Sequence, residues 1–152
     1  MIIGKPARHL TADNALDCVF GYSCFNDGSV RDYQRKSNQW TIGKNFDETG
    51  GFGPWIVTAD EIPDPQNLPL WTEVNGKKMQ NGSTKTMIFG VKTLVSYVSH
   101  FITLHAGDVI ATSPDLSLAA GSTLATSISA ISAMRRVSVL NSIALRNAMR
   151  FR

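Results

Sequence analysis

Short apolar runs separated by polar and turn residues recur along the first two thirds of the chain, and this pattern predicts several short strands. The segments "MIIG", "CVFGYSCF" and "WIVTA" are short apolar runs beside turn residues, which is typical of buried strands. "LWTEVNGKKMQNG" predicts a β-hairpin, because two strand-like runs flank an Asn75-Gly76 pair that favours a type I′ turn. "MIFG" and "HAGDVIAT" are also strand-like.

Few segments have a helical pattern. "TADNALDCV" predicts a short helix with Thr11 as its N-cap, and a short polar helix is expected from Ser29 to Lys36. From Gly90 to Thr103 apolar residues recur every 3.6 positions, which predicts a helix packed on a sheet through Val91, Leu94, Val95, Val98 and Ile102. Strands therefore outnumber helices, and the pattern favours an α+β, β-rich fold in a single domain over residues 1–152.

Composition narrows the class of protein. The 152 residues suffice for one domain with a real core, and no apolar run approaches the length of a membrane-spanning helix. The N-terminus lacks the pattern of a signal peptide, so we expect a cytoplasmic protein that does not interact with membranes. Cys18 and Cys24 are expected to be reduced thiols, because two cysteines six positions apart make neither a zinc site nor a disulfide framework.

The net charge of +3 is a property of the C-terminal segment. Residues 1–112 carry ten Lys or Arg against eleven Asp or Glu, whereas residues 113–152 carry five Arg against one Asp. The tail arginines are scattered, without the interleaved aromatic residues of many nucleic-acid-binding segments. We therefore expect no nucleic-acid partner. Residues 113–136, rich in Ser, Ala, Leu and Thr, show no clear period, and the closing "VSVLNSIALRN" is again weakly strand-like.

The stretch "NDGSVRDYQ" is the first candidate for chemistry. On helical spacing Asp27, Arg31 and Gln34 share one polar stripe, where an apolar one is usual. In one interpretation Asp27 is a turn or N-cap carboxylate. In the other it is a metal ligand, and Arg31 and Gln34 hold an anionic substrate, because the planar guanidinium suits carboxylates.

Lys44 is the second candidate. It follows Gly43 in "TIGKNF", close to aromatic residues and to further glycines that permit close backbone approach to a ligand. Such a lysine can stabilise a developing oxyanion, although a surface-loop lysine would look the same in sequence. Other acidic residues stand in adjacent pairs in loops, so these residues alone suggest too few carboxylates for a metal site.

The residues from Ile2 to Thr112 together resemble the C-terminal catalytic domain of the fumarylacetoacetate hydrolase family. The resemblance rests on several motifs in order: "IGKPAR", "NDGSVRDYQ", "WTIGKNF", "GPWIVTADEIPDPQ", "VNGKKMQNGST", "MIF" and "ITLHAGDVIAT". It implies a β-rich roll or sandwich with few helices and a homodimer. It also implies a cofactor, Mg²⁺ or alternatively Mn²⁺ or Ca²⁺, and hydrolysis of a C–C bond in a β-diketo acid of the acylpyruvate or fumarylacetoacetate type.

Carried over by motif, the resemblance makes Asp27 a metal ligand and Lys44 the active-site lysine. Arg31 and Gln34 would line the substrate site and take part in catalysis with Lys44. Thr112, retained from the end of the last motif, would also contact substrate. The keto-acid substrate would then lie where Asp27 and Lys44 converge.

Two departures from the family pattern keep alternatives open. The family's Glu-x-Glu metal ligands and its lid precede "IGKPAR", and the sequence begins at Met1, close to that motif. The glycine-rich loop expected after "GDVIAT" is replaced by "TSPDLSLAAGS". The chain is therefore expected to bind Mg²⁺ weakly and to expose apolar area on its sheet. It could be an inactive, partial family member that acts as a folded or dimerising domain, or a decarboxylase or isomerase of keto diacids.

Overall fold

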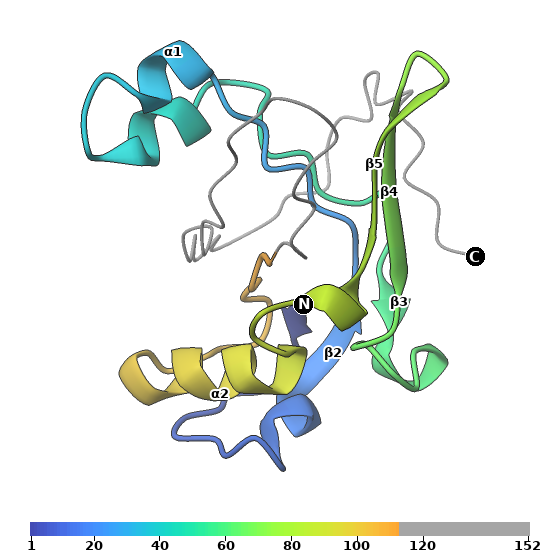
Figure 1. The fold of residues 1–152 in the computed structure, drawn as a ribbon. Coiled ribbons are helices and arrows are strands. Elements are labelled where there is room, and N and C mark those ends of the chain that lie inside the picture. The colour runs from blue at the N-terminus through green and yellow to red at the C-terminus, as the bar shows by residue number, and fades with distance from the viewer. Residues whose placement is uncertain (113–152) are drawn as a thin grey trace. The chain divides into compact units, whose positions relative to one another are not determined.

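The computed structural model describes residues 1–112, which divide into two compact units (Figure 1). The first unit, which we call the sheet unit, contains Met1–Tyr22 and the described residues from Val57 onward. The second, which we call the site unit, is the continuous segment Ser23–Ile56. The atypical residues 113–136 and the closing strand-like segment lie outside the described residues.

Three short antiparallel strands form the sheet of the first unit, in the order β1 (Ile2–Ile3), β2 (Val19–Tyr22) and β3 (Val57–Thr58). In β2 Val19, Gly21 and Tyr22 are buried, and Phe20 is 52% exposed. The prediction of a buried strand therefore holds for β2 except at Phe20.

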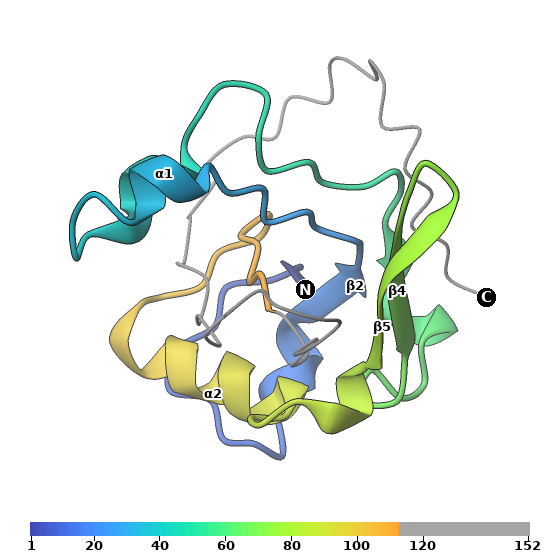
Figure 2. The same cartoon turned by 45° about the horizontal axis from the view of Figure 1, so that its top comes forward.

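Helix α2 (Val91–Phe101) belongs to the same unit (Figure 2). Its buried residues follow the predicted stripe. Val91, Val95 and Val98 are buried, while Leu94 and Ile102 are partly buried. These side chains join residues from the strands and from the segment after α2 in one core, made of Ile3, Ala15, Cys18, Val19, Tyr22, Val91, Val95, Val98, Leu104 and Ile110. Burial of these apolar side chains is the main favourable contribution to folding of this unit.

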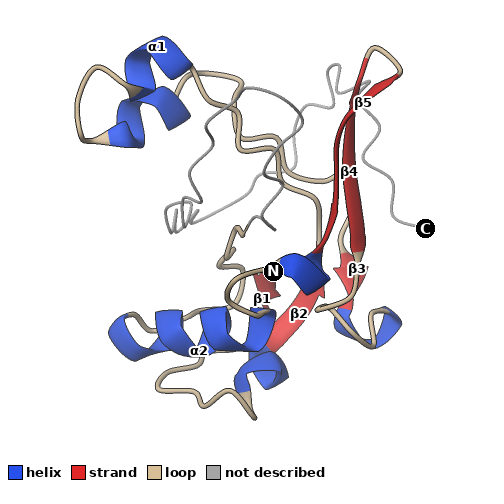
Figure 3. Cartoon of the chain, viewed as in Figure 1, coloured by secondary structure: helices blue, strands red, loops and turns tan. Residues whose placement is uncertain are grey.

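The predicted hairpin is present as β4 (Pro69–Val74) and β5 (Lys77–Ser83), which pair antiparallel (Figure 3). Asn75 and Gly76 both have positive φ, 52° and 77°, as a type I′ turn requires. The turn matches the twist of the strands, which explains why the Asn-Gly pair was a reliable signal.

The predicted N-terminal helix is a 3₁₀-helix, η1 (Ala15–Cys18), and Thr11 is not its N-cap. Instead the side-chain oxygen of Asn14 accepts hydrogen bonds from the Thr11 backbone N–H, at 2.8 Å, and from the Thr11 hydroxyl, at 3.2 Å. Asn14 therefore stabilises the turn before η1. Its side-chain oxygen accepts from the Thr11 N–H, so the chain forms a local turn there and not a longer helix.

Three other expectations about strands need correction. "MIFG" is not a strand: a 3₁₀-helix, η4 (Thr84–Thr86), precedes it, and Ile88 and Phe89 are exposed as the chain turns into α2. "WIVTA" keeps only the two residues of β3 and continues as the 3₁₀-helix η3 (Ala59–Glu61). "HAGDVIAT" contributes an isolated bridge from Val109 to Ile2 in place of a regular strand.

Short antiparallel strands with few helices make the fold α+β and β-rich, as expected from the sequence. The longest helix within residues 1–112 is α2, with 11 residues. Among the described residues, no helix has both the length and the apolar character needed to cross a bilayer.

Candidate functional site

The site unit carries four of the five predicted site residues. Its helix α1 (Arg31–Gln34) and its 3₁₀-helix η2 (Trp40–Lys44) pack against each other. Before α1, the backbone around Asp27 is held by the segment after η2: Asn26 donates its N–H to the Gly51 carbonyl, at 2.8 Å, and Phe25 forms a bridge with Phe52. These contacts hold the backbone immediately before Asp27.

The expected helix from Ser29 to Lys36 is shorter, and Asp27 does not belong to it. The helix begins at Arg31, so Asp27, Arg31 and Gln34 do not share one helical stripe. Two local hydrogen bonds compete with helix formation: Gly28 N–H donates to the Asn26 carbonyl, and the Ser29 hydroxyl donates to the Asp27 carbonyl. Asp27 is therefore a loop residue.

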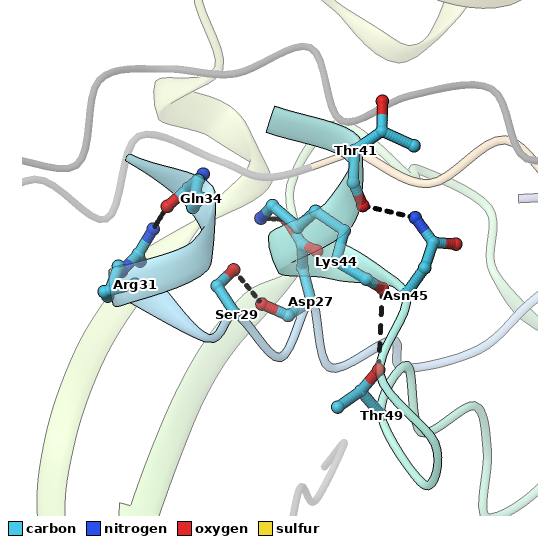
Figure 4. A network of polar contacts seen from close by, with 8 residues as sticks. All are labelled: Asp27, Ser29, Arg31, Gln34, Thr41, Lys44, Asn45 and Thr49. Carbon is cyan, nitrogen blue, oxygen red and sulfur yellow. Dashed lines mark hydrogen bonds and ion pairs between the residues drawn. The ribbon is translucent and has the colours of Figure 1, made fainter. Parts of the chain in front are cut away.

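Asp27 and Lys44 are nevertheless brought together. The Lys44 ammonium donates to Asp27 Oδ2 in an ion pair, with side chains that are 21% and 33% exposed respectively (Figure 4). The two residues are 17 positions apart, and the loop between them contains α1 and the start of η2. Lys44 is thus a partly buried lysine at the end of η2, held in an ion pair, which favours the site interpretation over that of a surface-loop lysine.

Arg31 and Gln34 form the second polar pair. Arg31 Nη1 donates to Gln34 Oε1 at 2.5 Å, one helical turn along α1 (Figure 4). Gln34 is only 7% exposed, whereas Arg31 remains partly accessible. A buried amide oxygen that accepts a hydrogen bond from a guanidinium restricts the orientation of that guanidinium. The remaining N–H donors of the guanidinium suit a carboxylate. Arg31 is therefore oriented by Gln34 in a way that allows anion binding.

Gly43 was not singled out as a site residue, although it sets the spacing between α1 and η2. A Cβ on Gly43 would lie 2.5 Å from Gln34 Cβ and 2.7 Å from Gln34 Cα, so no side chain fits there. The Gly43 carbonyl also accepts the Val30 N–H at 2.8 Å. The sequence shows a glycine next to Lys44, but it does not show that this glycine packs against Gln34.

Thr112, the fifth predicted site residue, is exposed and belongs to the sheet unit. Its contact with substrate stays a prediction. Cys18 and Cys24 are both free and buried, in agreement with reduced thiols. Burial raises the pKa of both thiols, so neither resembles an activated nucleophile.

A divalent cation needs more ligands than the described residues bring together. Mg²⁺ requires several oxygen ligands, and within residues 1–112 no three His, Cys, Asp or Glu side chains gather in a way that could hold a metal ion. Asp27 is the described residue that the resemblance places on a metal, and its carboxylate contacts Lys44. The described residues by themselves therefore do not fit a divalent cation.

Several known proteins are similar to this chain. A provisionally named hydrolase of Burkholderia multivorans is 50% identical over 113 residues, covering 74% of this chain and 40% of that protein. The structure of a fumarylacetoacetate hydrolase from Exiguobacterium antarcticum is 48% identical, with a TM-score of 0.67, over 70% of this chain and 38% of that one. A 5-carboxymethyl-2-hydroxymuconate delta-isomerase from Mycobacterium smegmatis is 39% identical, with a TM-score of 0.65, over 70% and 41%.

The chain thus spans about 40% of the length of the curated relatives that it matches. The family model described as the fumarylacetoacetate (FAA) hydrolase C-terminal domain matches residues 1–138, which extends beyond the motifs that end at Thr112. The sequence motifs, the β-rich fold and this match agree, and the chain belongs to the fumarylacetoacetate hydrolase family.

Proposed function

We propose that the chain contributes the keto-acid-binding part of an enzyme that hydrolyses a C–C bond in a β-diketo acid, such as an acylpyruvate. The observation that carries the proposal is the placement of Lys44 and Arg31 in one small unit, each held by a polar partner from the same motifs. Two cationic side chains with fixed orientations suit a substrate that carries a carboxylate and develops an enolate charge.

In the proposed reaction, water adds to the acyl carbonyl carbon of the substrate. The bond from that carbon to the adjacent methylene carbon then breaks, and its electron pair passes into the enolate of pyruvate. The enolate takes a proton on carbon, so the products are a carboxylic acid and pyruvate. The Lys44 ammonium would stabilise the enolate oxygen, and Arg31, oriented by Gln34, would bind the substrate carboxylate.

Several features of the proposal rest on family membership alone. A homodimer, a cytoplasmic location and a divalent cofactor, Mg²⁺ or else Mn²⁺ or Ca²⁺, stay predictions. The role of Asp27 as a metal ligand also stays a prediction, because the described residues supply one such carboxylate. The dimer can be checked by light scattering of the purified chain over a range of concentrations.

The test uses the purified 152-residue chain with acetylpyruvate as the probe, followed by loss of its enol absorbance. Replacing Lys44 with Met should lower kcat by about 100-fold or more, the usual effect of losing one oxyanion donor. The matched control is Lys36→Met, because Lys36 lies in the same unit, 3.8 Å from the Tyr33 ring centroid, and its turnover should stay within twofold. A folded wild-type chain without turnover would contradict the proposal and favour an inactive family member.

A second candidate is isomerisation of a keto diacid, favoured by the 39% identity to the Mycobacterium smegmatis isomerase. Both reactions pass through an enolate or dienolate next to a carboxylate, so Lys44 and Arg31 would serve either one. Product analysis separates them: hydrolysis gives two smaller acids, whereas isomerisation conserves the mass of the substrate. Decarboxylation would release carbon dioxide as well.

A further inference from the structure

The contact between Lys44 and Asp27 has a consequence for cation binding that does not depend on the catalytic proposal. The ammonium of Lys44 contacts Oδ2 of Asp27, and both side chains are less than half exposed. A carboxylate in direct contact with an ammonium has its charge largely compensated at short range. We propose that Lys44 is a built-in cation for Asp27 and that it lowers the affinity of this carboxylate for a divalent cation.

Three observations support this assignment. The ion pair joins the loop before α1 to the end of η2. The backbone of Lys44 therefore belongs to a helical segment and not to an irregular loop. The close approach of Gly43 to Gln34 holds that segment against α1. Within residues 1–112 no set of three carboxylate, imidazole or thiolate side chains offers a cation a better alternative.

Side-chain hydrogen bonds also hold the backbone at the end of η2. Asn45 Nδ2 donates to the Thr41 carbonyl at 2.5 Å, and the Thr49 hydroxyl contacts the Lys44 carbonyl at 3.5 Å (Figure 4). The same hydroxyl donates to the Phe46 carbonyl at 2.6 Å. These bonds stabilise the backbone turns on both sides of Lys44. A displaced Lys44 would therefore have to leave through rotation of its side chain, with the backbone of η2 in place.

The proposal is tested with Mn²⁺ as the probe, measured by electron paramagnetic resonance on the full chain. The wild type should bind weakly, in the millimolar range. Lys44→Gln should bind about tenfold more tightly, because it removes a unit charge at contact distance from the carboxylate. Lys44→Arg keeps the charge and should show no gain. Lys36→Gln, which removes a charge elsewhere in the same unit, should also show none.

The double variant Asp27→Asn with Lys44→Gln locates the effect: the gain should disappear. A gain that persists there, equal affinities of Lys44→Gln and wild type, or submicromolar binding by the wild type would each overturn the proposal. A measurement on the wild type alone covers the case of a variant that does not fold. A titration of the wild type with Mn²⁺, followed by the same resonance, should reach half-saturation at millimolar metal. Half-saturation at micromolar metal would contradict the proposal.

Discussion

Gly43 approaches Gln34 so closely that a Cβ on the glycine would lie 2.5 Å from Cβ of Gln34. This contact joins η2 to α1 and places Lys44 one residue beyond it, in reach of Asp27. The pairs Lys44–Asp27 and Arg31–Gln34 therefore depend on Gly43, where no side chain fits.

Replacing Gly43 with Ala should destabilise the site unit by about 1–3 kcal/mol, because the added methyl group forces α1 and η2 apart. The measurement is urea unfolding followed by Trp fluorescence. Gly28→Ala is the matched control in the same unit, since a Cβ there would meet Thr49 Cβ at an ordinary 3.6 Å. Equal stability of the two variants would contradict the role given to Gly43.

Replacing Gln34 with Leu should raise KM for the keto acid by about five- to thirtyfold, with a smaller effect on kcat. The amide that holds the Arg31 guanidinium is lost, and a hydrogen bond to a charged group is worth about 1–2 kcal/mol. Steady-state kinetics with acetylpyruvate measure the split. Gln34→Glu, which still accepts from Arg31, should recover most of the affinity. An unchanged KM in Gln34→Leu would show that Gln34 does not orient Arg31.

Replacing Gln66 with Ala should lower the free energy of unfolding of the sheet unit by about 1–2 kcal/mol. Its Oε1 accepts from the Val91 N–H, the first of α2, at 2.7 Å, and its Nε2 donates to the Thr84 carbonyl. Gly90, the N-cap of α2, has no side chain that could do the same. Asn67→Ala is the control, because Asn67 is exposed. Thermal unfolding by circular dichroism should separate the two variants.

The α-amino group of Met1 should make stability rise with pH between about 6 and 8. Burial lowers its pKa from 8.0 to about 6, while the Met1 N–H donates to the Ile110 carbonyl at 3.0 Å. Between pH 6 and 8 the unfolded chain holds a proton on this amino group that the folded chain lacks. The resulting loss of stability, about 3 kcal/mol, is complete below pH 6 and absent above pH 8. Urea unfolding at several pH values measures this. Chain acetylated at Met1 should lack this contribution, and identical profiles for the two forms would refute it.

Cys18 and Cys24 should both be slow to react with a thiol reagent in the native chain and fast in denaturant. Their burial raises the pKa of each thiol, so the thiolate that reacts is scarce. Titration with Ellman's reagent counts the groups, with two expected after unfolding. Rapid modification of either cysteine at neutral pH in the folded chain would mean that the segment carrying it opens readily.

The sequence by itself was enough for the features that local chemistry controls. The Asn75-Gly76 turn followed from the preference of those residues for positive φ, and α2 followed from the spacing of Val91, Val95 and Val98. The order of the motifs was enough for the family, since each motif carries several residue types at set spacings. The same motifs selected Asp27 and Lys44, which the fold then brought into contact.

The tertiary structure decided what depends on residues far apart in the chain. The loop that carries Asp27 is held by a segment farther along the chain, because the Asn26 N–H donates to the Gly51 carbonyl. "MIFG" failed to form a strand, although its pattern was suitable, because a strand needs a partner and the chain turns there into α2. Packing between segments decides which carboxylate a lysine contacts and which glycine has no room for a methyl group. The periodicity of a single segment carries no information about such contacts.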